Sequence, residues 1–285
     1  MDPEAFLEIA NQIYRIQMYP FFEIAHCLVT CISVREDLAR DAHVLSRKHP
    51  LACWIVCMVA INAGSILTSF LLGEPVLSAF KNQNSVLLAT GAWYMVFYSP
   101  FEVGYKILKF LPVKLALNIM KEVVRCRKVH DGVVYAAKIY PNSYLIMIII
   151  GTVKGNGSAF LKVFERLLRG VWTPEITELL IMNFPTKASI AASVVFVLNK
   201  KTEIIPAPNT LVYFGVALFF VYFKISSMLL GIHDPFVPFE NLYCAIFFGG
   251  IWDKLSKPFM QACGVDYKNS EALKDRRPES AKKKE

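Results

Sequence analysis

Residues 111–130 read LPVKLALNIMKEVVRCRKVH, and their spacing places four basic side chains on one face of a helix. At 100° per residue, Lys114, Lys121, Arg125 and Lys128 lie within roughly 60° of each other, and we call these four residues the basic stripe. The opposite face is apolar and carries Leu115, Ile119, Met120, Val123 and Val124. Because a cation at membrane depth is costly, the stripe predicts a water-filled cavity, an ion path or an anionic ligand. Two other interpretations of the stripe remain. The helix could lie on the membrane surface with its cations on anionic lipid headgroups, or the long side chains could extend from the end of a span to the membrane–water interface.

The composition predicts an all-α membrane protein. The chain has 285 residues, of which 55% are hydrophobic, and its mean hydropathy is +0.41. A soluble protein has about 45–50% apolar residues, and several apolar stretches here reach the roughly 20 residues that span a bilayer. The acidic start, Met1-Asp2-Pro3-Glu4, has no basic region, so we expect no cleavable signal peptide.

Seven transmembrane helices are expected, the fourth and fifth from their amphipathic period because both carry charge. Their predicted ranges are 17–34, 51–72, 85–101, 109–130, 143–168, 176–198 and 209–230. Together they form one domain over 17–230. Around it we expect an N-terminal luminal segment (1–16), a C-terminal juxtamembrane segment (231–265) and a disordered basic cytosolic tail (266–285).

The basic residues of the connectors predict the orientation in the membrane. The connectors after the first, third and fifth spans, with the tail, hold most of the Lys and Arg outside the spans, for example Arg35, Lys106 and Arg169. Since cytosolic loops are enriched in these residues, the N-terminus is expected in the lumen and the C-terminus in the cytosol. Lys282 and Lys283 resemble a dilysine endoplasmic-reticulum retrieval signal; the alternative is a solvated run of charge.

A weak internal repeat relates two three-span units, over about 17–101 and 109–198, that are followed by the seventh span. Residues of the same kind recur about 92 positions apart: Pro20 with Pro112, Gly64 with Gly157, Ser65 with Ser158 and Arg35 with Arg127. Because three is odd, the two units must have opposite orientations. Inverted repeats with interrupted helices at matching places predict a site where the repeats meet.

The stretch Gly151-Thr152-Val153-Lys154-Gly155-Asn156-Gly157 predicts a kink in the fifth span. The amides released there, with the Lys154 ammonium, are suited to hold a phosphate. The alternative is close helix packing through small residues.

Two sets of candidate site residues follow. The candidates for lipid phosphate binding are Lys121, Arg125, Lys128, Lys154, Gly155 and Gly157. The candidates for the pore or its kinks are Lys114, Gly64, Ser65, Gly151 and Ser158.

Enzyme, metal and nucleic-acid functions are not indicated. The five histidines are dispersed, and the sequence has no GxSxG, HExxH or paired intramembrane carboxylates. The seven cysteines have no zinc-ligand spacing, so we expect them to fill space within the spans. We therefore expect no enzyme activity, no metal site and no nucleic-acid partner.

Several motifs resemble those of trimeric intracellular cation (TRIC) channels of the animal type. The stretch Lys121-Glu122-Val123-Val124-Arg125-Cys126-Arg127-Lys128 matches the family pattern KEVxRxxK. Further matches are Phe70-Leu71-Leu72-Gly73-Glu74-Pro75, Tyr140-Pro141, the glycine stretch from Ile150 and the stretch from Arg166 to Pro174. The similarity covers roughly residues 15–255.

The resemblance implies seven spans in two inverted repeats and a homotrimer with one pore in each subunit. It implies a monovalent cation channel, chiefly for potassium, in the endoplasmic or sarcoplasmic reticulum, with the nuclear envelope as a further location. Its current would balance charge during calcium release, which couples it to calcium-release channels. It also implies membrane-lipid partners and phosphatidylinositol 4,5-bisphosphate bound beside the pore by Lys121 and Arg125. The family often has paired glycines in the second span, where this chain has Ala63-Gly64.

The basic stripe is in tension with cation conduction, because basic residues along a pore repel cations. Residues alone favour a secondary transporter or channel for a small anion, and a lipid-binding scaffold without transport is a third possibility. Our hypothesis is that lipid phosphates neutralise Lys121 and Arg125, so that cations pass hydroxyls and carbonyls near Ser65. The stripe is also a candidate voltage-sensitive element, with a structural charge pair as the alternative.

Overall fold

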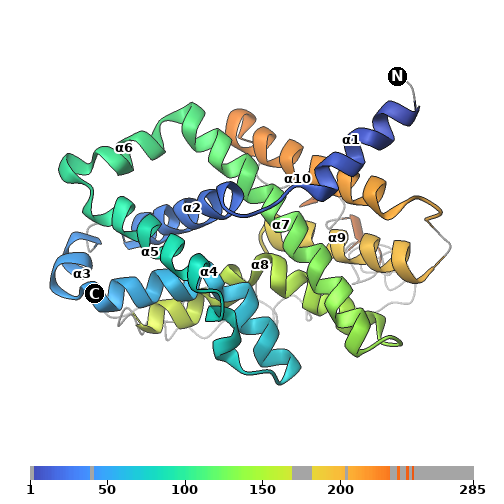
Figure 1. The fold of residues 1–285 in the computed structure, drawn as a ribbon, viewed down its shortest axis with the longest axis horizontal. Coiled ribbons are helices and arrows are strands. Elements are labelled where there is room, and N and C mark those ends of the chain that lie inside the picture. Colours follow the sequence, from blue (N-terminus) through green and yellow to red (C-terminus); the bar gives the residue numbers. More distant parts are fainter. Residues whose placement is uncertain are drawn as a thin grey trace, which may run out of the picture. The chain divides into compact units, whose positions relative to one another are not determined.

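The computed structural model describes residues 3–38, 42–168, 182–202 and 205–231, with five further residues between 236 and 246. Every regular element among these residues is a helix (Figure 1). In chain order they are α1 (Pro3–Arg15), α2 (Phe21–Leu38), α3 (Ala42–Lys48), α4 (Pro50–Leu72), the 3-10 helix η2 (Val76–Phe80), α5 (Gln83–Tyr98), the 3-10 helix η3 (Pro100–Glu102), α6 (Val103–Lys109), α7 (Leu111–Ile139), α8 (Tyr144–Leu168), α9 (Phe184–Lys201) and α10 (Asn209–Leu230).

The helices α2, α4, α5, α7, α8, α9 and α10 fall on the seven predicted spans, in order. The largest difference is α7, which continues nine residues beyond the predicted end at 130. Within the described residues, three helices are long and apolar enough to cross a bilayer by length and composition: Pro50–Leu72, Tyr144–Lys162 and Asn209–Leu230. Almost all of the predicted juxtamembrane segment (231–265) and the whole predicted tail (266–285) lie outside the described residues.

Most of the predicted N-terminal luminal segment (1–16) forms the helix α1, which the sequence analysis did not predict. Its apolar residues recur at helical spacing, but polar residues between them keep the mean hydropathy low. A search for apolar stretches therefore misses it. The sequence analysis also did not predict the helices α3 and α6. Each has seven residues, about two turns, and lies in a connector between predicted spans.

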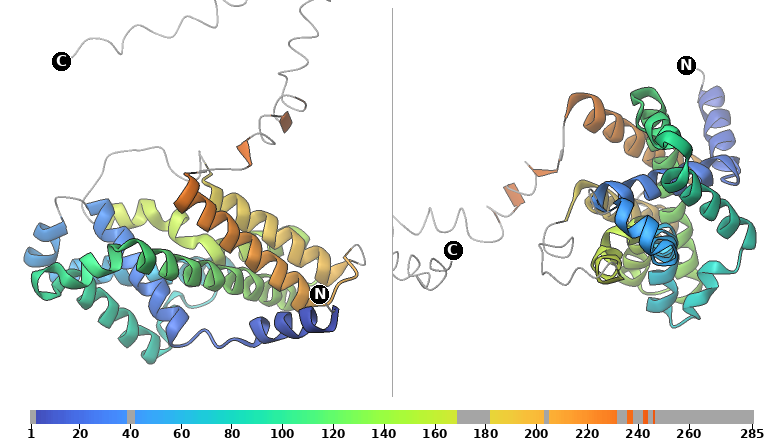
Figure 2. Two further views of the ribbon diagram at one scale, coloured as in Figure 1. Left: turned by 90° about the horizontal axis from the view of Figure 1, so that it is seen from above. Right: turned by 90° about the vertical axis from the view of Figure 1, so that its left-hand side faces the viewer.

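Helix α8 is central to the arrangement of residues 3–231. It packs against α7, α4 and α9, while α2 packs against α7 and α5 (Figures 1 and 2). Helix α10 covers α7, and α1 lies along α10, where the Phe6 and Phe214 rings meet edge to face at 5.3 Å. The matched helices of the two predicted repeats, α2 with α7 and α4 with α8, are thus in direct contact.

Helices α4 and α8 cross where their glycines meet. A Cβ atom added to Gly64 would fall on the carbonyl oxygen of Lys154, and one added to Gly157 would fall on the backbone of Gly64. Helix α8 is broken at Asn156, where φ is −132° and ψ is 27°, which confirms the predicted kink. The expected break at Gly64 is absent, because α4 is continuous from Pro50 to Gly73. Gly64 serves close approach instead.

The five described cysteines fill space, as predicted. Cys27 and Cys31 of α2 and Cys53 and Cys57 of α4 are fully buried in one apolar core that α5 completes. All are free thiols, as is the buried Cys126 of α7. Cys244 and Cys263 lie outside the described residues.

A buried arginine fastens the turn between α5 and α6. Arg35 of α2 donates to the Val96 carbonyl oxygen at 2.5 Å and forms an ion pair with Glu102. Its guanidinium also lies 4.0 Å from the centre of the Tyr105 ring. Phe101 and Glu102 have positive φ values of 52° and 58°, a strained conformation for residues with side chains. The contacts of Arg35 stabilise this turn.

We expect Gly64→Ala to destabilise the fold by about 1–3 kcal/mol, because the added methyl group meets a backbone carbonyl that cannot rotate away. The measurement is the apparent unfolding temperature of the detergent-solubilised protein. Gly91→Ala is the matched control, since nothing lies within 4 Å of that position on α5. It should leave stability unchanged or raise it by up to about 1 kcal/mol. Equal unfolding temperatures for the two variants would contradict the crossing.

Candidate functional site

Three residues of the basic stripe surround one small space. Lys121, Arg125 and Lys128 of α7 line it with His26 of α2 and a segment of α8, namely Gly155, Asn156 and Ser158. The break at Asn156 turns this segment of α8, and Gly155 lets α8 approach α7, since a Cβ there would meet Val129. The space measures about 20 Å³, which is room for roughly one water molecule.

Lys128 is held by a histidine. Its Nζ donates to His26 Nε2 at 2.9 Å, and the same ring nitrogen lies 3.2 Å from the Ile61 carbonyl oxygen. An ammonium has no acceptor, so the ring nitrogen must accept this bond. The bond joins α2 and α7, because a ring nitrogen that accepts from Lys128 cannot also donate to the Ile61 carbonyl. Lys128 has no ion pair with a carboxylate among the described residues.

Arg125 is neutralised within its own helix. Its Nη1 lies 2.5 Å from the Oε2 of Glu122, one turn earlier, and both side chains are largely buried. A buried guanidinium without such a partner would be costly. The basic stripe therefore contains one paired arginine, and Lys121 and Lys128 carry its unpaired charge in this space.

The remaining candidates for the site lie elsewhere. Lys114 lies nearer the start of α7 and does not line the small space. The Lys154 ammonium lies 5.7 Å from the centre of the Tyr135 ring, on another side of α8. Gly157 lies at the crossing with α4, and Gly151 packs against Val133 and Ser193, where a Cβ would come within 2.7 Å of both. The two glycines thus allow close helix packing.

A larger cavity of about 570 Å³ adjoins the small space at the contact between His26 and Lys128, which line both. Uncharged polar groups contribute much of its wall: Gln17, Asn62, Ser65, Asn82 and Ser85. Its charged groups are Arg15, Glu23, Arg127, Lys128 and Asp131. The cavity thus has a wall of mixed polar and apolar character, and it contains carboxylates as well as cations. Ser65, a predicted pore residue, faces it.

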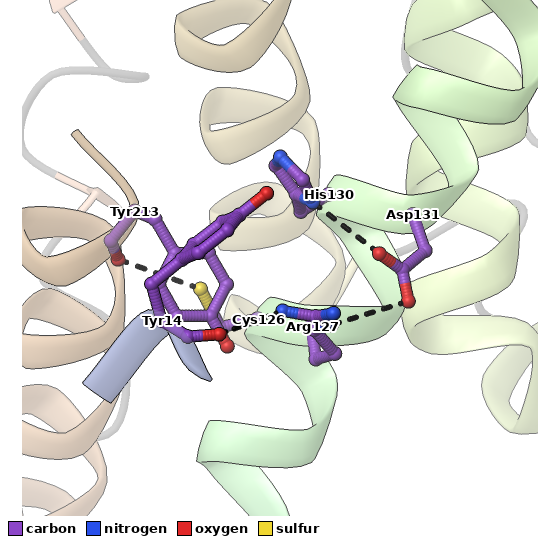
Figure 3. A network of polar contacts seen from close by, with 6 residues as sticks. All are labelled: Tyr14, Cys126, Arg127, His130, Asp131 and Tyr213. Atoms are coloured by element: carbon purple, nitrogen blue, oxygen red, sulfur yellow. Dashed lines mark hydrogen bonds and ion pairs between the residues drawn. The ribbon is translucent and has the colours of Figure 1, made fainter. Parts of the chain in front are cut away.

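One wall of this cavity belongs to a polar network between α1, α7 and α10 (Figure 3). Arg127 donates to the Tyr14 carbonyl oxygen at 3.0 Å, and its Nε lies 3.4 Å from the Oδ2 of Asp131. His130 Nδ1 lies 3.3 Å from the other oxygen of Asp131, and the His130 ring meets the rings of Tyr14 and Tyr213 edge to face. The network fixes the end of α1 at the mouth of the cavity.

The sequence reasoning missed most of the cavity wall. Glu23 and His26 are one turn apart on α2, and Asn62 and Ser65 are one turn apart on α4. Two polar residues at helical spacing within an apolar span are the signal that could have identified them.

The comparisons with known proteins now bear on this geometry. The TRIC channel family matches residues 39–231. This chain belongs to that family. The TRIC family consists of ion channels, so it is not a family of enzymes.

Known TRIC channels align over most of the chain. It is 49% identical to a trimeric intracellular cation channel type 1B.1 of Caenorhabditis elegans over 257 residues, which is 90% of this chain and 87% of the relative. A solved structure of a trimeric intracellular cation channel from C. elegans, determined in the absence of Ca²⁺, has 45% identity and a TM-score of 0.77. It covers 82% of this chain and 100% of its own. A structure from work on TRIC counter-ion channels in calcium release has 35% identity and a TM-score of 0.75, covering 79% of this chain and 99% of its own.

We expect Arg127→Gln to release α1 from this TRIC channel, because the guanidinium is the link between the Tyr14 backbone and Asp131. Amide hydrogen exchange of residues 3–15, followed by mass spectrometry, should rise several-fold. Lys138→Gln is the matched control, since it removes one charge from an exposed position of the same helix. Unchanged protection of α1 in Arg127→Gln would refute this role of the network.

Proposed function

We propose that this protein is a monovalent cation channel, chiefly for potassium, in an intracellular membrane. It works as a homotrimer with one pore in each subunit and supplies counter-ion current during calcium release. Membership in the TRIC family and the names of the relatives, trimeric intracellular cation channel and counter-ion channel, support this function. The endoplasmic or sarcoplasmic reticulum is the proposed membrane.

The observation that carries the proposal is the pair of cavities that meet at one contact. The proposed route runs from the cavity of about 570 Å³ to the small space beside Ser158 past His26 and Lys128, which line both. The 2.9 Å contact between these two residues is therefore the proposed constriction. It closes the route in the state described, and the lysine must move for ions to pass.

The charges of this route are compatible with cations. Asp131 offsets Arg127 in the larger cavity, and Glu122 offsets Arg125 beside the smaller one. Glu23 adds a carboxylate to the cavity wall, and amides and hydroxyls supply oxygens that can replace water around a cation. The tension between the basic stripe and cation conduction is thereby reduced before any lipid binds.

The seven long helices are the proposed spans, with the N-terminus in the lumen and the C-terminus in the cytosol. The contacts of α2 with α7 and of α4 with α8 support two inverted repeats, because matched elements meet at the axis that relates them. Gly64 and Gly157, 93 residues apart, touch at one such crossing.

Phosphatidylinositol 4,5-bisphosphate is the proposed lipid at Lys121 and Arg125. Both cations face the small space beside the break of α8. That space of about 20 Å³ does not hold a phosphate, so binding requires the break to open or α7 to shift. Lys121 has no carboxylate partner among the described residues, which leaves its charge available for the phosphate.

We expect currents through the purified protein in a planar bilayer to reverse near the potassium equilibrium potential under a potassium chloride gradient. Lys128→Gln should keep this reversal potential and raise the current, because the amide lacks the charge that blocks the route. Lys138→Gln, at an exposed position of α7, is the control and should match the wild type. Reversal near the chloride potential would instead support an anion channel, and saturable flux without unitary steps an anion transporter.

We expect Lys121→Ala/Arg125→Ala to weaken binding to vesicles that contain phosphatidylinositol 4,5-bisphosphate by tenfold or more, about 1.4 kcal/mol or more. Co-sedimentation measures this, with vesicles of uncharged lipid as the blank. Lys154→Ala is a useful comparison, since its ammonium lies outside the small space. If the double variant bound these vesicles with wild-type affinity, the proposal that the lipid binds at Lys121 and Arg125 would be wrong.

A further inference from the structure

A third cavity lies between α7, α9 and α10, and the proposed ion route does not use it. It measures about 300 Å³, at the lower end of the roughly 300–1,000 Å³ of small-molecule sites. It shares only Arg125 with the small space beside α8. Its wall consists of Glu122, Arg125, Asn183, Phe184, Pro185, Ala188, Phe220, Phe223, Lys224 and Ser227.

The charges of this cavity leave one cation in excess. Arg125 is engaged by the Glu122 carboxylate at 2.5 Å. Lys224 projects from α10, one of the three helices apolar enough to cross a bilayer, and forms neither a hydrogen bond nor a close ion pair with any described residue. An unpaired ammonium in apolar surroundings is costly, so the cavity favours an anion.

The start of α9 adds to this preference. Asn183, Phe184 and Pro185, at the N-terminal end of this 18-residue helix, border the same cavity. No side-chain hydrogen bond caps the helix there. The positive end of the helix dipole therefore faces the cavity that contains Lys224, and both favour negative charge.

The rest of the wall is apolar and reaches the surface. Phe184 and Phe223 lie with ring centroids 5.5 Å apart, and Ala188 and Phe220 are buried behind them. Phe223, Lys224 and Ser227 are half-buried, so the cavity opens between α9 and α10. Helix α10 is apolar enough to cross a bilayer, so an apolar tail from the surrounding lipid is the occupant that suits this opening.

We propose that the cavity between α7, α9 and α10 binds an amphiphile with one anionic head group, a carboxylate or a phosphate, and an acyl tail. Lys224 contacts the head group, Arg125 is its second cation, and the phenylalanine rings contact the tail. The site is separate from the proposed phosphoinositide site, which depends on Lys121. Because Arg125 lines both spaces, an anion in this cavity competes with Glu122 for it and changes the charge beside the ion route.

Direct binding to the full-length protein in nanodiscs tests this proposal. The probes are radiolabelled oleate for the carboxylate, 1-oleoyl lysophosphatidate for the phosphate and oleyl alcohol for the same tail without charge. We expect saturable binding of at least one anionic probe, and Lys224→Gln should weaken it about tenfold, as for loss of a partly desolvated charge contact. Lys138→Gln, which removes an exposed charge from α7, should bind as the wild type does.

A second variant keeps the charges and removes the space. Ser227→Phe should abolish binding by filling the cavity from α10, while the apparent unfolding temperature reports that the fold is intact. If Lys224→Gln unfolds, Ser227→Phe carries the test. If only one anionic probe binds, that probe identifies the head group as a carboxylate or a phosphate. If both bind, the site accepts either anion and the proposal still holds. Wild-type affinity in both variants, equally tight binding of oleyl alcohol, or no binding of either anion would overturn it.

The outcome is separable from that of the phosphoinositide proposal. Lys121→Gln should leave oleate and lysophosphatidate binding unchanged, because Lys121 does not line this cavity. Loss of phosphoinositide binding in Lys121→Gln, with loss of the single-chain probes in Lys224→Gln, establishes two sites. If Lys121→Gln weakens the single-chain probes as strongly as Lys224→Gln does, one shared site replaces the proposed second one.

Discussion

A charged side chain inside an apolar protein needs a partner or water, and α7 imposes this requirement repeatedly between positions 114 and 128. Carboxylates of α7 itself meet it for two arginines, and a histidine of α2 meets it for Lys128. Glu122 pairs with Arg125, Asp131 with Arg127, and His26 accepts from Lys128. The contact with His26 links α2 to α7, and a water-sized space remains beside Lys121 and Lys128. The candidate ion route follows the cations that have no carboxylate partner.

The features predicted correctly from the sequence are those that depend on the local spacing of apolar residues and on the positions of glycines. The seven long helices were identified because apolar residues or an amphipathic stripe recur over enough length, and α10 matches its predicted range of 209–230. The break of α8 followed from three glycines within seven residues. Gly64 shows the limit of such rules. A lone glycine permits either a kink or a close approach, and only the partner helix, here the backbone of Lys154, decides between them.

The candidate site was predicted only in part, because its contacts join residues that are far apart in the sequence. The period of α7 brought Lys121, Arg125 and Lys128 together correctly. It could not supply His26, which lies 102 residues from Lys128, or show that Lys154 turns toward Tyr135. The 570 Å³ cavity has walls from α2, α4, α5 and α7, so no single stretch carries its signature. Low hydropathy likewise concealed α1, whose role depends on Arg127.

The contacts of Arg35 and Arg127 carry a consequence for how the chain assembles. Each arginine donates to a backbone carbonyl, pairs with a carboxylate and lies over a tyrosine ring, Tyr105 for Arg35 and Tyr14 for Arg127. The tyrosines are 91 residues apart, close to the spacing of the arginines, so α1 and α6 occupy matching places before α2 and α7. Arg35 thus holds the turn before α6, and Arg127 holds the end of α1. The bonds of these arginines to backbone carbonyls join residues 61 and 113 positions apart, so each forms only after both of its residues have left the ribosome.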